Sequence, residues 1–363
     1  MAAAAERAAY RPAPWWNRAS YRVFWFVVGG AIRVLFRLRI ENRPRLRGPA
    51  VLVANHASFI DPMVLGAASW RRIRFMMASM HYDSPRGNWF YRWHRAISVS
   101  LTGANRESLR TARASLEAGE IVGVFPEGGL TRTGLLREPK FGLLSYMIAG
   151  FDETRDRDVV FVPVGINYDR VIEDRVLTHS RKTQIGKRTF QFGIGKVFGF
   201  VWNLIVLRYQ GKLYRYGYAC ASFGEPVSLK DWLKRKRRKI SAASPEQKFA
   251  LIEKFGTDLM QDVGKVIPVL PVALVSSVFE SSGQEAMTEL ELKSRCFELS
   301  KELEANGAHL YIPREDRDYA VGAGLRMLTL RHLVIEEDGC FRASPDEGEL
   351  ITYYANSIRH LLA

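Results

Sequence analysis

A histidine and an aspartate five residues apart are the chain's first candidates for acid–base chemistry. His56 and Asp61 follow the apolar run 51–54, within the segment Asn-His-Ala-Ser-Phe-Ile-Asp-Pro. A histidine just beyond a strand can act as a general base near neutral pH, and a nearby carboxylate can hold its ring in one tautomer. An Asp followed by Pro62 is also typical of a helix N-cap and first helical position. The spacing alone does not decide between these two roles.

A second polar segment follows another strand-like run, 121–124. It reads Phe-Pro-Glu-Gly-Gly-Leu-Thr-Arg-Thr-Gly from Phe125 to Gly134, and Lys140 lies six residues beyond it. Adjacent glycines let backbone N–H groups approach an anion closely, and Arg132 and Lys140 supply charge that can pair with a phosphate. The alternative is a glycine-rich turn with solvated cations. We favour a phosphate site because the segment accompanies the histidine and aspartate.

The two segments together resemble the signature of the glycerolipid acyltransferases, which acylate glycerol-3-phosphate or lysophosphatidate. The resemblance implies a histidine base that activates the acceptor hydroxyl, an aspartate that orients it, and a Glu-Gly-Arg block that binds the acceptor phosphate. The catalytic roles fall on His56 and Asp61. The implied phosphate-binding residues are Glu127, Gly128, Gly129, Thr131, Arg132 and Lys140.

Two further stretches refine this resemblance. Residues 131–134 (Thr-Arg-Thr-Gly) and 139–142 (Pro-Lys-Phe-Gly) are similar to the pattern of the glycerol-3-phosphate acyltransferase branch, with a threonine where that branch has a serine. Residues 162–169 resemble the family's fourth block, which implies acyl-donor binding by Pro163, although a buried strand explains the stretch equally well. The resemblance favours glycerol-3-phosphate as the acceptor, with lysophosphatidate as the alternative.

The chain departs from the family pattern at one position. The family usually has an arginine at the end of the strand before the connecting helix, and Gly103 stands at that place. Arg106, three residues later, could replace it in phosphate binding. An exposed arginine on a helix is the simpler interpretation of Arg106, so it is a candidate of lower standing than the residues above.

These placements predict a reaction that uses neither a metal ion nor a bound cofactor. His56 would take a proton from the glycerol hydroxyl, which attacks an acyl thioester, while Asp61 supports the developing imidazolium. The thioester is a co-substrate, either acyl-CoA or acyl-acyl carrier protein, and the sequence does not distinguish them. Backbone amides would stabilise the tetrahedral oxyanion. The chain lacks a Gly-x-Ser-x-Gly sequence, which argues against a serine esterase.

Charge is distributed unevenly along the 363 residues. Residues 266–363 contain nine Lys and Arg against sixteen Asp and Glu, a net charge of −7, whereas the rest carries +22 and includes the basic run 234–239. Such a basic surface suits anionic lipid headgroups, phosphorylated substrates and an acidic acyl carrier protein. A nucleic-acid-binding protein is the alternative from a different class. The acidic C-terminal part argues against nucleic acid, since a DNA-reading domain must neutralise phosphates.

The N-terminal segment mixes aromatic and apolar residues with arginines. Residues 15–38 begin with two tryptophans and include four arginines, a composition suited to an interfacial membrane helix and too charged for a confident span. The alternative is a helix packed on the protein's own surface. No cleavable signal peptide is convincing, and three unclustered cysteines indicate neither a disulfide framework nor a zinc site. We expect a protein at the cytoplasmic face of a membrane, peripheral or shallowly inserted.

The order of elements predicts an α/β fold with a mixed sheet flanked by helices. The expected strands lie near 50–54, 72–77, 96–101, 121–125 and 159–166, and the helices between them near 61–69, 105–118 and 139–149. Residues 187–223 are also β-rich. Both polar segments then fall at the carboxyl ends of strands, where open α/β sheets place their ligands.

We expect three regions along the chain. Residues 1–45 form a helical membrane-associating segment, 46–226 the α/β acyltransferase domain, and 227–363 a smaller, mainly helical domain. The last region contains a helix near 245–265 and then the order of a winged-helix module, with helices near 287–305 and 316–330 followed by a turn between two short strands. It is also similar to the tail of the glycerol-3-phosphate acyltransferases.

Overall fold

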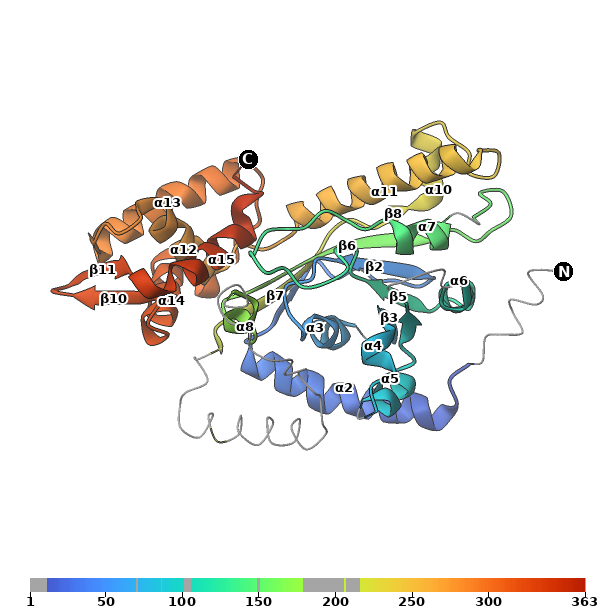
Figure 1. Cartoon of the computed structure of the whole chain (residues 1–363), viewed down its shortest axis with the longest axis horizontal. Helices are drawn as coiled ribbons and strands as arrows, with labels where there is room; N and C mark the ends of the chain where they lie inside the picture. The colour runs from blue at the N-terminus through green and yellow to red at the C-terminus, as the bar shows by residue number, and fades with distance from the viewer. Residues whose placement is uncertain are drawn as a thin grey trace.

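A mixed eight-stranded sheet lies at the centre of the molecule (Figure 1). The computed structural model describes residues 12–69, 71–85, 87–100, 106–148, 151–178, 206 and 216–362. The strand order is β1-β7-β6-β2-β5-β3-β4, with β8 beside β6. The strands are β1 (Arg39–Glu41), β2 (Ala50–Ala54), β3 (Ile73–Ala78), β4 (Ile97–Val99), β5 (Ile121–Val124), β6 (Val160–Tyr168), β7 (Ala219–Phe223) and β8 (Val227–Ser228). The predicted α/β fold is confirmed.

The middle of the sheet is parallel. Strand β2 pairs with β5 and β6, and β3 pairs with β4 and β5, all in parallel, whereas β7 and β8 run antiparallel to β6. All of β2 is buried, as expected of a strand covered on both faces. Leu52 joins one core while Val51 and Val53 join the other, following the two-residue period of a strand. The carboxyl ends of β2, β5 and β6 therefore meet at one edge.

Helices cover both faces of this sheet (Figure 1). On one face lie α2 (Trp15–Leu35) and α3 (Asp61–Ala68), and on the other α6 (Arg106–Glu117), α7 (Gly142–Ile148), α10 (Leu229–Arg235) and α11 (Pro245–Lys265). The shorter helices are α4 (Ser79–Tyr82), α5 (Asn88–His94) and α8 (Asp174–Thr178). The predicted elements between residues 50 and 168 agree with these bounds to within three residues. Of the predicted β-rich stretch, 187–205 and 207–215 lie outside the described residues.

The start of the long helix α11 follows from its sequence. Ser244 accepts a hydrogen bond from the backbone N–H of Gln247, whose side chain accepts one from the backbone N–H of Ser244. This capping box satisfies N–H groups that a helix start leaves without partners. Thr288 and Glu291 form the same box at the start of α13. The helix predicted near 245–265 is confirmed, and its apolar side packs on the sheet.

The remaining C-terminal residues form a bundle of helices with a small sheet. The elements are α12 (Pro271–Ser282), β9 (Met287–Thr288), α13 (Glu289–Ala305), η3 (Pro313–Glu315), α14 (Arg317–Leu330), β10 (Val334–Glu337), β11 (Cys340–Ala343), η4 (Pro345–Glu347) and α15 (Gly348–Arg359). Strands β10 and β11 form a hairpin, and β9 pairs with β11. The winged-helix order predicted from the sequence is therefore present.

The C-terminal helices are tied to the end of strand β6. Asp169, just after β6, accepts hydrogen bonds from the backbone N–H of Val272 at 2.9 Å and of Tyr218 at 2.8 Å. Asn167 donates to the carbonyl of Pro268 at 2.9 Å. An apolar cluster includes both this side of the sheet and the C-terminal helices. The predicted domain limits near residues 45 and 226 stay predictions.

Candidate active site

The first polar segment forms the turn between β2 and α3. His56 Nδ1 lies 2.8 Å from Asp61 Oδ2, with the Asp61 side chain fully buried and 18% of the His56 side chain exposed. Asp61 Oδ2 also accepts the backbone N–H of Ser58 at 2.9 Å. Asp61 is the first residue of α3, and among the described contacts this helix has no side-chain cap. The alternative that Asp61 serves only as a helix cap is therefore wrong.

Strand β6 supplies a third donor to the same carboxylate. The Tyr168 hydroxyl donates to Asp61 Oδ1 at 2.6 Å. Tyr168 is fully buried, and burial first, then the neighbouring charge of Asp61, raises its pKa well above the usual value. The hydroxyl therefore stays protonated and remains a donor. Both oxygens of Asp61 thus accept hydrogen bonds, which fix the position of the carboxylate beside His56.

The ring of His56 is oriented on two sides. Because the Asp61 carboxylate accepts the proton on Nδ1, the lone pair that can take up a proton is on Nε2. The Phe125 ring stacks on the imidazole, with centroids 4.3 Å apart and an interplanar angle of 19°. A histidine held in this way, with part of its ring exposed, is suited to accept a proton from a bound hydroxyl.

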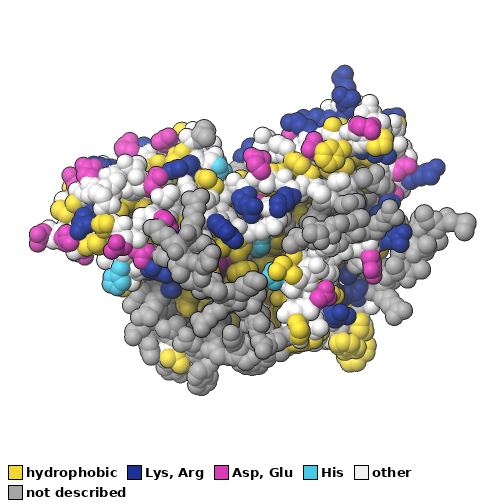
Figure 2. All heavy atoms as spheres, viewed as in Figure 1, with side chains coloured by type: hydrophobic (Ala, Val, Ile, Leu, Met, Phe, Trp, Pro, Cys, Tyr) yellow, Lys and Arg dark blue, Asp and Glu magenta, His cyan; other side chains and the backbone are white. Residues whose placement is uncertain are grey.

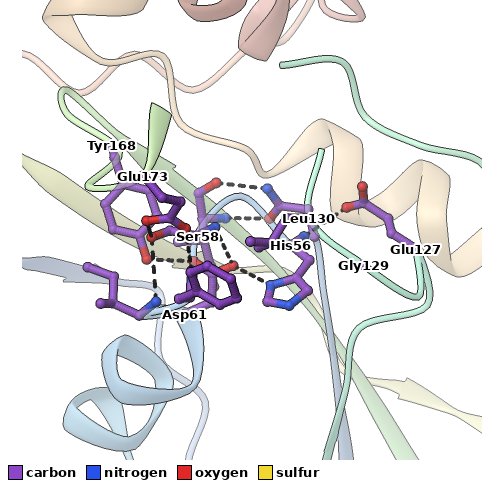
Figure 3. Close-up of polar contacts among 12 residues, drawn as sticks. His56, Ser58, Asp61, Glu127, Gly129, Leu130, Tyr168 and Glu173 are labelled. Atoms are coloured by element: carbon purple, nitrogen blue, oxygen red, sulfur yellow. Dashed lines mark hydrogen bonds and ion pairs between the residues drawn. The ribbon is translucent and has the colours of Figure 1, made fainter. Parts of the chain in front are cut away.

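Glu127 lies beneath the turn rather than at its surface. Its carboxyl accepts the backbone N–H of His56 at 2.8 Å through Oε1 and that of Arg137 at 3.3 Å through Oε2. The side chain is buried, and burial raises its pKa to about 7. Figure 3 shows Glu127 on one side of His56 and Tyr168 and Glu173 on the other. The sequence predicted that Glu127 binds phosphate; its described contacts are to the backbone of the site.

The segment from Glu127 to Lys140 forms a loop packed against the His56 turn. The backbone N–H of Thr131 donates to the carbonyl of His56 at 3.3 Å, and the Thr131 hydroxyl donates to the carbonyl of Leu135 at 2.9 Å. Gly128 has φ of +68°, a left-handed backbone conformation that favours glycine, and its nearest neighbour is the side chain of Lys140.

The cations of this loop point to solvent. Arg132, Arg137 and Lys140 are exposed, and Arg137 donates to the carbonyl of Gly129 at 3.1 Å. Figure 2 shows Lys and Arg side chains gathered near the middle of one face, next to exposed histidine atoms. Such an arrangement of backbone and cations beside a histidine can hold a phosphate while a neighbouring hydroxyl reaches the base.

A small cavity of about 30 Å³ lies behind His56. Its lining comes from the His56 turn, the loop, the end of strand β6 and helix α15, and includes His56, Glu127, Thr131, Gly134, Tyr168, Tyr353, Tyr354 and Ser357. Such a volume holds about one water molecule and is too small for an acceptor. Pro163 is not among the described lining residues; it is buried within β6 and pairs with Val53. Arg106 begins α6, but its side chain and Gly103 lie outside the described part of the chain.

The predictions from the sequence did not include two residues that support the turn. Tyr168 is one, and Glu173 is the other: its carboxyl accepts the backbone N–H of Phe59 at 2.6 Å and the hydroxyl of Ser58 at 3.1 Å. Burial raises the pKa of Glu173 to about 7. Tyr168 could have been found from its place at the end of an apolar strand beside the two strands that carry the motifs. Glu173 belongs to an irregular segment after β6 and has no comparable signal.

Two family models match the chain. The model described as Acyltransferase matches residues 36–167, and the model described as Glycerol-3-phosphate acyltransferase C-terminal region matches residues 202–363. The first covers β2, β5 and both polar segments, and it ends one residue before Tyr168. The second covers the C-terminal helices, including α15, which lines the small cavity.

Similar proteins carry the same family name. The chain is 30% identical over 292 residues to the glycerol-3-phosphate acyltransferase of Alteromonas mediterranea, which covers 76% of this chain and 33% of that protein. It is 30% identical over 257 residues to the glycerol-3-phosphate acyltransferase of Shewanella woodyi, 67% of this chain and 30% of that protein. The chain thus spans about a third of the length of these relatives.

A solved structure is similar to a lesser degree. It is the 1-acyl-sn-glycerophosphate acyltransferase from Thermotoga maritima, with a TM-score of 0.38, 17% identity, and coverage of 68% of this chain and 82% of that one. The family models and the curated relatives confirm the resemblance that the two motifs predicted: residues 36–167 match an acyltransferase domain, and residues 202–363 match the C-terminal region of glycerol-3-phosphate acyltransferases.

Proposed function

We propose that this protein transfers a fatty acyl group from a thioester to a hydroxyl of glycerol-3-phosphate in phospholipid synthesis. The observation that carries the proposal is the contact of 2.8 Å between His56 and a buried Asp61, next to a loop with exposed cations. The relatives named above as glycerol-3-phosphate acyltransferases support the choice of acceptor.

In the proposed reaction His56 is the general base. Its Nε2 takes the proton of the acceptor hydroxyl, whose oxygen attacks the thioester carbonyl and forms a tetrahedral intermediate. Collapse of this intermediate breaks the carbon–sulfur bond, and the imidazolium returns its proton to the leaving thiolate. Asp61 stabilises the imidazolium between the two steps, and Tyr168 holds Asp61. A base of this kind contributes about 100- to 10,000-fold to the rate.

The loop supplies the proposed acceptor site. Arg132 and Lys140 would pair with the phosphate, together with the backbone N–H group of Gly129, whereas the N–H of Gly128 donates to the carbonyl of Phe125. Lysophosphatidate also has a phosphate beside its free hydroxyl, so it is the alternative acceptor. The donor is acyl-CoA or acyl-acyl carrier protein, and the basic surface of residues 1–265 would attract an acidic carrier protein. The proposal includes no metal ion and no cofactor beyond the donor.

We also propose that helix α2 lies on the cytoplasmic face of a membrane. Its exposed apolar side chains are Trp15, Trp16, Val23, Phe26, Val27 and Val34. At 3.6 residues per turn they fall within about a third of the helix circumference. None of the helices in the described residues is long and apolar enough to cross a bilayer. A peripheral or shallowly inserted helix fits this pattern.

A flotation assay tests the membrane proposal. The protein should float with vesicles that contain anionic lipid, and Phe26→Asp should weaken this binding because Phe26, 84% exposed, is the most exposed of these apolar side chains. Equal flotation of Phe26→Asp and the unaltered protein would overturn the assignment to α2.

A nucleic-acid-binding role is the alternative of a different class. Its support is the winged-helix order of the C-terminal elements. The net charge of −7 over residues 266–363 opposes it, because binding to DNA depends on neutralising phosphates. We therefore propose no nucleic-acid partner, and a binding assay with duplex DNA at low salt should detect no specific complex.

An acyl-transfer assay on the purified chain tests the main proposal. Labelled glycerol-3-phosphate and lysophosphatidate are each offered with palmitoyl-CoA and with palmitoyl-acyl carrier protein. We expect acylation of glycerol-3-phosphate with at least one donor. Product from lysophosphatidate alone would favour the alternative acceptor, and no product from either would reject acyl transfer to a glycerol phosphate.

A further inference from the structure

The loop that carries Arg132 rests against the C-terminal helix α15. Asn356, in the last turn of that helix, donates from Nδ2 to the carbonyl oxygen of Thr133 at 2.7 Å. Asn356 is only 5% exposed, so this hydrogen bond lies in a buried contact. Thr133 directly follows Arg132 in the chain, and the bond therefore fixes the peptide next to the cation.

The next residue shows how close this contact is. Gly134 has φ of +83°, and a Cβ at this position would lie 1.9 Å from the carbonyl oxygen of Tyr353. The nearest atoms belong to the backbone of α15, which cannot move aside as a flexible side chain can. Only glycine fits here, both because of its φ and because of the space. The backbones of the loop and the helix are thus in direct contact.

Arg132 lies between two anchored peptides. On one side the N–H of Thr131 donates to the carbonyl of His56 at 3.3 Å. On the other side the carbonyl of Thr133 accepts from Asn356. The exposed guanidinium is therefore presented from a short segment whose position is set by the catalytic turn at one end and by the C-terminal helix at the other.

Helix α15 is itself firmly held in place. The Tyr354 hydroxyl accepts from the backbone N–H of Val171 at 3.2 Å and from Arg331 at 2.8 Å, and it donates to Asp174. At the end of the helix, His360 Nε2 lies 3.0 Å from the carbonyl oxygen of Gly264. These contacts join α15 to the segment after β6 and to α11, so the helix is a rigid support for the loop.

We propose that Asn356 is a positioning residue for the acceptor phosphate, and that the C-terminal domain contributes to acceptor affinity through it. The inference rests on the function proposed above, because it assigns Arg132 to the acceptor phosphate. Asn356 touches neither substrate in this proposal. It acts through the Thr133 peptide, which fixes the backbone position from which the Arg132 side chain extends.

The test compares two asparagine variants of the full chain. Asn356→Ala removes the hydrogen bond to Thr133 and should raise the KM for glycerol-3-phosphate about tenfold, a change of about 1.4 kcal/mol. The kcat and the KM for the acyl donor should stay close to those of the unaltered enzyme. Asn306→Ala is the matched control, since Asn306 donates to the carbonyl of Leu361 at 3.0 Å within the C-terminal domain, away from the loop. It should leave all three constants unchanged.

A second variant approaches the same contact from the loop. Gly134→Ala places a methyl group against the Tyr353 carbonyl and should raise the KM for glycerol-3-phosphate further than Asn356→Ala. Melting curves will show whether Asn356→Ala folds. If it does not, Gly134→Ala still tests whether the contact between the loop and α15 sets the affinity for the acceptor. Calorimetric titration with glycerol-3-phosphate in the absence of donor should show the same order of affinities.

The outcomes separate this inference from the proposed function. An unaltered enzyme that acylates glycerol-3-phosphate, with the same acceptor KM in Asn356→Ala, Gly134→Ala and Asn306→Ala, overturns the inference alone. An equal rise in the KM values for donor and acceptor also overturns it, because a general structural defect has no preference for the acceptor. An unaltered enzyme that acylates no glycerol phosphate overturns the proposed function, and the inference with it.

Discussion

The two polar segments of the site are held in different ways. In the turn from His56 to Asp61, side chains do the holding: Asp61 is buried and accepts from the His56 ring, the Ser58 N–H and the Tyr168 hydroxyl. In the loop from Glu127 to Lys140, the described hydrogen bonds involve mainly backbone groups, and the cations are exposed. The difference suggests a base that is oriented before substrate binds, and a phosphate site whose geometry depends on the loop.

The largest expected effect is at the base. His56→Ala should lower kcat by about 100- to 10,000-fold, because the other ionisable side chain of the turn, Asp61, is fully buried. The melting temperature should change little, since Asp61 keeps the donors from Ser58 and Tyr168. His332→Ala, at an exposed position in the C-terminal domain, is the control. Near-normal turnover by His56→Ala would contradict its role as the base.

The loop should respond in affinity rather than in turnover. Arg132→Ala and Lys140→Ala should each raise the KM for glycerol-3-phosphate about ten- to a hundredfold, as expected for loss of a charge-assisted hydrogen bond. Their kcat at saturating acceptor should stay within a few-fold of normal, and the donor KM should not change. Arg110→Ala, on the exposed side of α6, serves as the comparison. A loss of kcat at unchanged KM would place these residues with the base instead.

Tyr168→Phe tests the buried contacts of the turn from His56 to Asp61 more finely. Loss of the hydroxyl removes one of the three donors to Asp61, so the carboxylate that orients the His56 ring is held less firmly. The kcat should therefore fall several-fold, with the KM values of both substrates unchanged. Tyr353→Phe, a buried tyrosine that lines the same cavity, should leave kcat unchanged. An unchanged kcat in Tyr168→Phe would mean that the hydroxyl only fills space.

The smallest expected effect concerns stability. Burial raises the pKa of Glu127 from 4.5 to about 7, so folding favours the neutral acid. The stability gained in this way is fully present below pH 4.5 and is lost as the pH rises toward about 7. Glu127→Gln cannot ionise and should show a flatter fall in melting temperature over that range. Glu336→Gln, at an exposed position, should keep the normal slope. A Glu127→Gln slope equal to that of the unaltered protein would refute the shift.

Local patterns in the sequence predicted much of the fold and the centre of the site. The apolar runs 50–54 and 121–124 became β2 and β5 because buried parallel strands need continuous apolar residues. The contact of His56 with Asp61 followed from a short turn between a strand and a helix. These features depend on residues close in sequence, and local spacing is sufficient to recognise them.

The supports of the site could not be predicted in this way. Tyr168 lies 107 residues from Asp61, and its side chain reaches the carboxylate only through the register that pairs β6 with β2. Asn356 meets Thr133 across 223 residues through the docking of the C-terminal helices. The sequence correctly placed Glu127 in the site. Its burial beneath the His56 backbone follows from packing between distant segments, which the motif does not encode.

The contact between the Glu127–Lys140 loop and helix α15 has a consequence for how the protein folds during synthesis. The bonded residues Thr133 and Asn356 are 223 positions apart, and ribosomes add about 5 to 20 residues per second. The loop therefore waits roughly 10 to 45 seconds after its own synthesis for the helix that supports it. The sheet and the His56 turn can form during that interval, so there is time for the base to be in place before the phosphate site is complete.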